Sequence, residues 1–310
     1  MLQAAGSLTA IALLVAVGVV MARRGLLGDR AVDGLKALIT RLTLPLLLFR
    51  AFLQLAPDGR NAVLALAVFA ACAVMGVIGA GLSRALRLPR PETRLLFQGF
   101  EAGMLGYALF VALHGDERLA AFAALDMGQV VFVFTTLLVQ MSVLEQRQAS
   151  GSAISFPWRD IARSAVLWAI AAGLTLSLAA PGPAATLSGP DGFAAPVFDT
   201  IGGLTTPLVC LVIGASLAGG VPRDPAIVTV VAARTLVGLG LGLVFGLLVV
   251  PALGFDAWHT KAAVMLFVLP APFVIPVYHR RQAAFVGSVL TLSTAVSIAL
   301  IAALAVLGVA

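Results

Sequence analysis

One carboxylate, Glu101, stands in the apolar stretch RLLFQGFEAGMLGYALFVALHG of residues 94–115, among Gly99, Gly103 and Gly106. An ionisable side chain in a segment of membrane-spanning length is energetically costly, and it is therefore a functional candidate. Glycines loosen a helix, so that its amides and carbonyls become available as ligands. This combination favours a proton-titrating group or a cation ligand at a break in a helix. The alternative is a protonated Glu101 that is hydrogen-bonded across a contact between two helices.

Two more ionisable side chains lie deep in apolar segments. Asp126 shares a helix face with Gln129, one turn later, and it is either a packing or pairing residue or a group that binds the coupling ion. Arg234 either neutralises Asp126 or Glu101, or holds a substrate carboxylate with its planar guanidinium. If both acids are charged, one arginine cannot balance them and also bind an anion. At least one proton or cation must then contribute.

Other polar residues in apolar segments have simpler interpretations. Arg41 and Arg50 are expected to extend towards the two membrane faces, and Asp199 to be a solvated helix end. The stretch TLSTAVS carries four hydroxyls that either bond to carbonyls of their own helix or line a site, namely Thr291, Ser293, Thr294 and Ser297.

The composition indicates lipid as the solvent. Hydrophobic residues make up 61% of the 310 residues and charged residues only 11%, whereas soluble domains carry about 25% charged residues. The net charge of +6 fits cationic loops that orient a membrane protein, and no basic patch with interleaved aromatic residues indicates a nucleic-acid partner. Cys72 and Cys210 each lie in an apolar run without disulfide or metal spacing, so we expect no cofactor and no metal.

The chain is predicted to be an all-α polytopic membrane protein with ten transmembrane helices. A bilayer core takes about 20 apolar residues per helix, and the apolar runs cover residues 3–22, 32–55, 61–83, 93–114, 118–143, 161–180, 194–219, 224–251, 257–278 and 282–309.

The basic residues predict the orientation. With the N-terminus outside, the inner connections collect fourteen Lys and Arg residues, and the outer connections hold only Arg60, Arg118 and Lys261. This bias places both termini on the extracytoplasmic side of the inner or plasma membrane.

The longest hydrophilic connection divides the chain into two five-helix halves. The first repeat is predicted to span residues 1–148 and the second 161–310, with a cytoplasmic linker at 149–160. An odd number of helices in each half forces the halves into opposite orientations, which is typical of an inverted repeat.

The halves also correspond in detail. The second helix of each carries a mid-helix Pro-Leu, at Pro45 and at Pro207, and the fourth helix of each is interrupted. Glycines interrupt the first of these, and the second contains Pro270, Pro272 and Pro276. Matching interruptions in two halves indicate a transport site near the membrane midplane.

Three stretches resemble the auxin efflux carrier family of secondary transporters: RRGLLGDRAVDGLKALITRLTLPLLLFRAF, IGGLTTPLVCLVIGASLAGG and AAVMLFVLPAPFVIPVYHRRQAAFVGSVLTLSTAVSI. The resemblance implies a ten-helix inverted repeat, shared in outline with sodium–bile acid symporters and sodium–proton antiporters, in which helices four and nine break and cross at the substrate site. It also implies organic-anion substrates, such as auxin, malate or malonate.

Carried over to this chain, the resemblance places the first crossover within Glu101–Tyr107, which includes Gly103 and Gly106, and the second around Pro270–Pro272. Many members have Asn ahead of the G-x-x-G of helix four, where this chain has Glu101. A carboxylate repels an anion unless it is protonated, so this difference bears on the substrate.

The expected function is therefore secondary transport of a small organic anion, with H⁺ favoured over Na⁺ as the coupling ion. The resemblance implies an elevator motion of helices 3–5 and 8–10 against a scaffold of helices 1, 2, 6 and 7. The expected partners are the bilayer, the anion and the ion, with a homodimer as an option. A membrane receptor is an alternative. An intramembrane enzyme is disfavoured, because the sequence has neither H-E-x-x-H nor G-x-S-x-G.

Overall fold

The structure is a computed structural model that describes residues 2–55, 58–88, 92–148, 165–188, 192–220, 224–275 and 283–309. In these ranges the chain forms helices, turns and irregular segments, without a strand. Five helices have the length and composition to cross a membrane: Gly59–Ala85, Asp116–Met141, Ala195–Leu217, Pro225–Ala252 and Phe285–Val306. Shorter apolar helices cover Ala12–Arg23, Ala102–His114 and Ala165–Ala179. The all-α, multi-pass membrane class is confirmed, and the count of ten spans stays a prediction.

Helices occupy all five predicted segments of the first half. They are α1 (Leu2–Arg23); α2 (Asp29–Leu38), η1 (Ile39–Thr43) and α3 (Leu44–Leu53), which are continuous; α4 (Gly59–Ala85); α5 (Glu92–Leu95), η2 (Ala102–Gly106) and α6 (Tyr107–His114); and η3 (Asp116–Arg118), α7 (Leu119–Phe132), η4 (Val133–Leu137) and α8 (Leu138–Gln148). Here η3 is a 3₁₀ turn and the other η segments are π-helical turns.

The second half also holds helices in its five predicted segments. They are α10 (Ala165–Ala179); α12 (Ala195–Val197), η5 (Phe198–Gly202) and α13 (Thr205–Leu217); α14 (Pro225–Val244), η6 (Phe245–Val249) and α15 (Val250–Ala252); α16 (Ala257–Val268); and α18 (Ala283–Val306). One further helix, α11 (Pro181–Ser188), lies in a predicted connection and begins with a proline, which the first helical turn tolerates. The linker 149–160 and Pro276 lie outside the described residues.

Close helix contacts depend on glycines. In the pair α4 and α7, a methyl group on Gly128 would lie 1.9 Å from the Ala65 carbonyl oxygen. In the pair α14 and α16, a methyl group on Gly238 would lie 2.3 Å from the Phe267 carbonyl oxygen. The glycine-rich stretch of α14 therefore serves helix packing. The helix α1 packs on α13, and α3 packs on α10.

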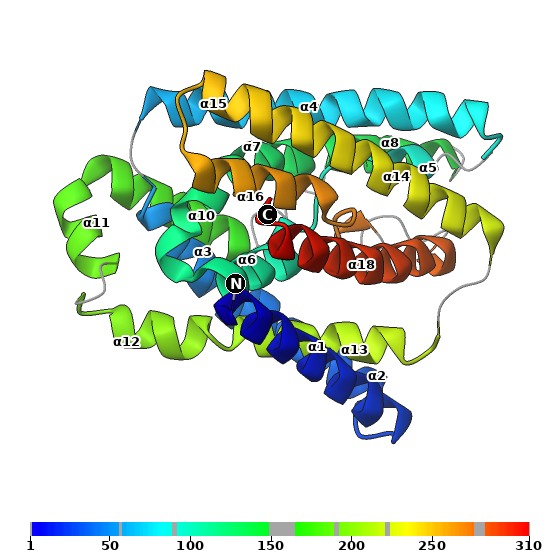
Figure 1. The fold of residues 1–310 in the computed structure, drawn as a ribbon, viewed down its shortest axis with the longest axis horizontal. Coiled ribbons are helices and arrows are strands. Elements are labelled where there is room, and N and C mark those ends of the chain that lie inside the picture. Colours follow the sequence, from blue (N-terminus) through cyan, green and yellow to red (C-terminus); the bar gives the residue numbers. More distant parts are fainter. Residues whose placement is uncertain are drawn as a thin grey trace.

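The helices α4 and α14 lie along one edge of the molecule, with α1 and α13 along the opposite edge (Figure 1). Both edge helices α4 and α14 present large apolar side chains outwards. Val77 is 74% exposed and Leu236 is 70% exposed. A surface of this kind suits contact with lipid.

Two irregular segments interrupt the helices near the centre. Residues 96–101 follow α5, and Gly99 adopts a φ of +68° that a residue with a side chain rarely adopts. This irregular segment directly precedes Gly103 and Gly106, which lie in the π-helical turn η2, and the expected crossover within Glu101–Tyr107 stays a prediction. The second break follows α16 at residues 269–272, and contains the two prolines predicted there.

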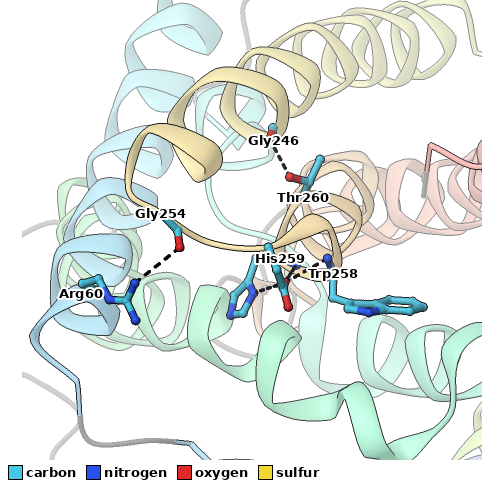
Figure 2. A network of polar contacts seen from close by, with 7 residues as sticks. Arg60, Gly246, Gly254, Trp258, His259 and Thr260 are labelled. Carbon is cyan, nitrogen blue, oxygen red and sulfur yellow. Dashed lines mark hydrogen bonds and ion pairs between the residues drawn. The ribbon is translucent and has the colours of Figure 1, made fainter.

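A polar network joins α4, α15 and α16 at one end of the molecule (Figure 2). The Asp256 carboxylate caps α16 by accepting the backbone N–H groups of Trp258 and His259 at 3.1 Å, and it lies 2.7 Å from Nδ1 of His259. Burial raises the pKa of Asp256, but the hydrogen bonds from His259 and Trp258 outweigh it and bring the pKa below the ordinary value. Arg60 donates to the Gly254 carbonyl at 3.4 Å. These contacts fix the start of α16, the helix that leads into the second break.

Candidate functional site

A cavity of about 1050 Å³ lies beside both breaks and is lined by residues of α2, η1, α3, η2, α7, η4, α10, α13 and α18. Seven of the predicted site residues line it: Glu101, Gly103, Asp126, Gln129, Pro272, Thr291 and Thr294. Most of the remaining wall is apolar, from side chains such as Leu44, Leu48, Phe134, Ile213 and Phe273. In the described part of the chain, no group of three or more His, Cys, Asp or Glu side chains has a metal-binding arrangement.

Glu101 connects the two breaks. One carboxylate oxygen accepts the backbone N–H of Met104 at 3.0 Å, at the start of η2, and the other accepts the N–H of Phe273 at 2.5 Å. The backbone N–H of Glu101 donates to the Pro270 carbonyl at 2.9 Å. Glu101 is buried among these partners, and its side chain also lines the cavity.

The hydrogen bonds of Glu101 explain why this position carries a carboxylate. An ionised carboxylate accepts hydrogen bonds with both oxygens, whereas a carboxamide accepts with one and donates with its nitrogen. Two backbone donors meet the side chain of Glu101, so an Asn or Gln would leave one of them facing another donor. A carboxylate at position 101 therefore satisfies two backbone donors that a carboxamide could not both satisfy.

Asp126 is held by two neutral donors. The hydroxyl of Tyr107 donates to one carboxylate oxygen and the amide nitrogen of Gln129 to the other, both at 3.0 Å. The helix-face prediction for Asp126 and Gln129 is thereby confirmed. Tyr107 is fully buried and is not part of the cavity wall. The amide oxygen of Gln129 is buried and has no hydrogen-bond partner among the described residues, so the site contains one free acceptor.

Arg234 contacts neither acid. Its guanidinium donates to the carbonyls of Leu96 at 2.6 Å, Gly99 at 2.7 Å and Leu269 at 3.2 Å. The side chain is 3% exposed, and it forms no ion pair among the described residues. Of the two alternatives for Arg234, pairing with Asp126 or Glu101 is not found in this structure, because carbonyls freed by both breaks surround the guanidinium, and binding of a substrate carboxylate stays a prediction. Arg234 does not line the cavity.

The remaining backbone positions have separate roles. A methyl group on Gly106 would lie 2.7 Å from the Phe122 ring and 2.8 Å from Leu269, so this glycine permits close packing away from the cavity. Pro270 contributes its carbonyl to Glu101 and does not line the cavity. Gly103 faces the cavity opposite Leu44.

Two of the four hydroxyls of α18 donate hydrogen bonds to backbone carbonyls, and the other two have no such bond among the described residues. Thr294 donates to the Leu290 carbonyl of its own helix at 2.8 Å and also lines the cavity, so both alternatives hold for this residue. Ser297 instead donates to the carbonyl of Val268 at 2.6 Å, because the last turn of α16 leaves that carbonyl free. The buried hydroxyl of Ser293 has no partner in the described ranges. Thr291 lines the cavity.

Two cations on the cavity wall were not predicted as site residues. Lys36 and Arg41 are exposed and line the cavity together with Thr40. Neither side chain has a hydrogen-bond or ion-pair partner within the described residues. The sequence carried a signal for this surface, because positions 36, 40, 44 and 48 recur every four residues and so share one helix face.

Arg50 is not a side chain that extends to the membrane surface. Its guanidinium lies 2.5 Å from the Asp116 carboxylate and 2.9 Å from the Asp199 carboxylate. The Arg50 side chain is buried and also lies over the ring of Phe198. These contacts join α3, η3 and η5, and Asp199 is thus an ion-pair partner as well as an exposed helix residue.

A comparison with known protein families agrees with a membrane protein of this kind. The family model described as membrane transport protein matches residues 4–306. The chain belongs to this family. It is the auxin efflux carrier family that the three sequence motifs resemble, and the resemblance is confirmed over nearly the whole chain. A search of curated proteins found no match. Membership of this transporter family implies a lipid bilayer and a transported substrate.

Proposed function

We propose that this member of the auxin efflux carrier family is a secondary active transporter of a small organic anion, coupled to H⁺. The observation that carries the proposal is the cavity that touches both helix breaks and holds Lys36 and Arg41 on its wall, two cations without an ion-pair partner among the described residues. A cavity of about 1050 Å³ is at the upper end of the range for small-molecule sites.

Arg41 is the group best placed to bind the anion. Leu44 stands at the level of Glu101, because a methyl group on Gly103 would lie 3.5 Å from Leu44 and 3.7 Å from a Glu101 oxygen. Arg41 precedes Leu44 by three residues, which is about 4.5 Å along a helix. Its planar guanidinium suits bidentate binding of a carboxylate. Lys36 lies further out, where it favours entry of anions.

We infer proton coupling from the charges at the deep end of the cavity, beside the helix breaks. Glu101 and Asp126 are both cavity-lining carboxylates, and the guanidinium of Arg234 is engaged by carbonyls. A bound anion adds a third negative charge beside the two acids. Uptake of a proton by one acid removes a negative charge, so protonation and anion binding favour each other. A Na⁺-coupled transporter is the alternative, with Na⁺ in the role of the proton.

We propose that the fold is a ten-span 5+5 inverted repeat in which helices four and nine cross at their breaks. The direct hydrogen bond from the Glu101 N–H to the Pro270 carbonyl supports this arrangement, since it joins the breaks of the two halves. Predicted helices four and nine correspond to α5–α6 and to α16 with the segment after it.

The packing of the helices supports a division into two parts that move relative to each other, a scaffold and a transport domain. The proposed scaffold consists of α1, α2–α3, α10 and α12–α13, which contact one another through the pairs α1 with α13 and α3 with α10. The proposed transport domain consists of α4, α5–α8, α14–α16 and α18, and it contains the pairs α4 with α7, α14 with α16 and α14 with α18. An elevator motion would move the second group along the first.

The proposed orientation makes this conformation inward-facing. With both termini extracytoplasmic in the plasma membrane, Lys36 and Arg41 lie on the cytoplasmic side of the cavity. The ion pair of Arg50 and Asp116 then lies on the outer side and joins the scaffold to the transport domain. An outward-facing state requires that this pair separates.

Counterflow in proteoliposomes tests the substrate class. Vesicles loaded with one unlabelled carboxylate are diluted into the labelled compound, for a panel of monocarboxylates and dicarboxylates, with an amine and a sugar as controls. We expect exchange of at least one carboxylate and of neither control, with slower exchange in Arg41→Gln at carboxylate concentrations below the KM. Exchange of the amine alone would contradict an anion site.

A further inference from the structure

Arg234 lies where three backbone carbonyls converge from two separate segments. Leu96 and Gly99 belong to the first break, Leu269 begins the second, and Arg234 itself extends from α14. Carbonyl oxygens at helix breaks are hard ligands that suit small cations, and in transporters with broken helices they coordinate coupling ions. Buried carbonyl oxygens need a donor or a cation, and at this cluster the guanidinium of Arg234 supplies both.

The charge at this cluster comes from the chain itself. Among the described residues, the guanidinium bonds to three backbone carbonyls from two segments and to no carboxylate. Its aromatic neighbour is Phe100, whose ring centre lies 5.7 Å from the guanidinium carbon. The positive charge of Arg234 therefore interacts with backbone carbonyl dipoles and not with a carboxylate. Neutralisation of a buried acid does not explain why this position carries an arginine.

We propose that the three carbonyls form a monovalent-cation site that the Arg234 guanidinium occupies permanently, in place of a dissociable Na⁺. A tethered cation cannot leave during the cycle, so it holds both breaks together in every conformation and contributes nothing to coupling. The proposal of this cation site does not depend on which substrate the protein transports. Its consequence, that a Na⁺ gradient does not drive flux, rests on the proposed transport function.

Thermal unfolding in detergent tests the site without any substrate. The wild type is melted in NaCl and in choline chloride at equal ionic strength, and Arg234→Ala is melted in the same salts and with methylguanidinium at millimolar concentration. We expect equal melting temperatures for the wild type in both salts. Arg234→Ala is expected to melt lower and to recover by several degrees with methylguanidinium, and to a smaller extent with Na⁺. Arg60→Ala removes an exposed arginine and is expected to show no such recovery.

Two conservative variants keep the test decisive if Arg234→Ala does not fold. Arg234→Lys retains a charge that reaches part of the carbonyl cluster, and Arg234→Gln retains donors without charge. We expect Arg234→Lys to be the more stable of the two. Stabilisation of the wild type by Na⁺ over choline would overturn the proposal, as would a Gln variant that equals the Lys variant or an Ala variant that no cation stabilises. None of these outcomes depends on whether a carboxylate is transported.

Discussion

Replacing Glu101 by Gln perturbs the contact that joins the two helix breaks. The carboxylate accepts from the Met104 N–H at 3.0 Å and from the Phe273 N–H at 2.5 Å. A Gln side chain has one acceptor oxygen, so one of these buried amides loses its acceptor and faces an NH₂ group. An unsatisfied buried donor costs about 1–3 kcal/mol. We therefore expect Glu101→Gln to destabilise the fold by about that amount and to abolish proton coupling.

The assay compares thermal unfolding and transport of Glu101→Gln with those of Glu117→Gln. Glu117 is an exposed carboxylate in η3, so its replacement controls for the loss of one negative charge. We expect a lower melting temperature only for Glu101→Gln, with counterflow retained and gradient-driven uptake lost. If Glu101→Gln melts and accumulates substrate as the wild type does, its two backbone contacts have no part in stability or coupling, and the reasoning is refuted.

Three further variants probe other parts of the structure. Arg41→Gln is expected to raise the KM for the anion about tenfold or more, since a charge-assisted bond contributes about 1.5–3 kcal/mol, and an unchanged KM in counterflow would exclude Arg41 from the site. Gly128→Ala places a methyl group 1.9 Å from the Ala65 carbonyl and is expected to cost about 1–3 kcal/mol. Size-exclusion chromatography should show less folded protein, and a wild-type yield and melting temperature would argue against this helix contact. Arg50→Gln removes the ion pair with Asp116 and is expected to favour the outward-facing state. A cysteine introduced on the cavity wall should then react more slowly with an impermeant reagent from the cytoplasmic side, and unchanged reactivity would argue against the ion pair as a constraint.

The helices could be predicted from the sequence because lipid requires long apolar segments. The helix α11 was missed, since its sequence PGPAATLS contains two prolines that resemble a turn. The exact extent of the first break, residues 96–101, could not be predicted either. Glycines on both sides of Glu101 predict a loosened backbone, but only Gly99 has a positive φ, and sequence alone does not distinguish it from Gly103.

The site was predicted in part. Glu101, Asp126 and Gln129 line the cavity as expected because polar side chains in apolar helices face a cavity or each other. The partners of Arg234 could not be predicted, since they are backbone carbonyls of two segments more than a hundred residues apart in sequence. The sequence predicts that Arg41 extends to the membrane face, and the structure places it, exposed, on the cavity wall. Its place in the cavity could not be predicted, because it depends on which helices pack around its own helix.

We propose that a proton and an organic anion are transported together through the cavity beside Glu101. Uptake of labelled malate and related carboxylates into proteoliposomes tests this proposal, under an imposed pH gradient and, separately, under a Na⁺ gradient, for the wild type and Glu101→Gln. We expect the pH gradient, and not the Na⁺ gradient, to drive uptake by the wild type. We expect Glu101→Gln to lose this uptake while counterflow remains. Flux driven by Na⁺ alone, or no flux of any carboxylate, would contradict the proposal.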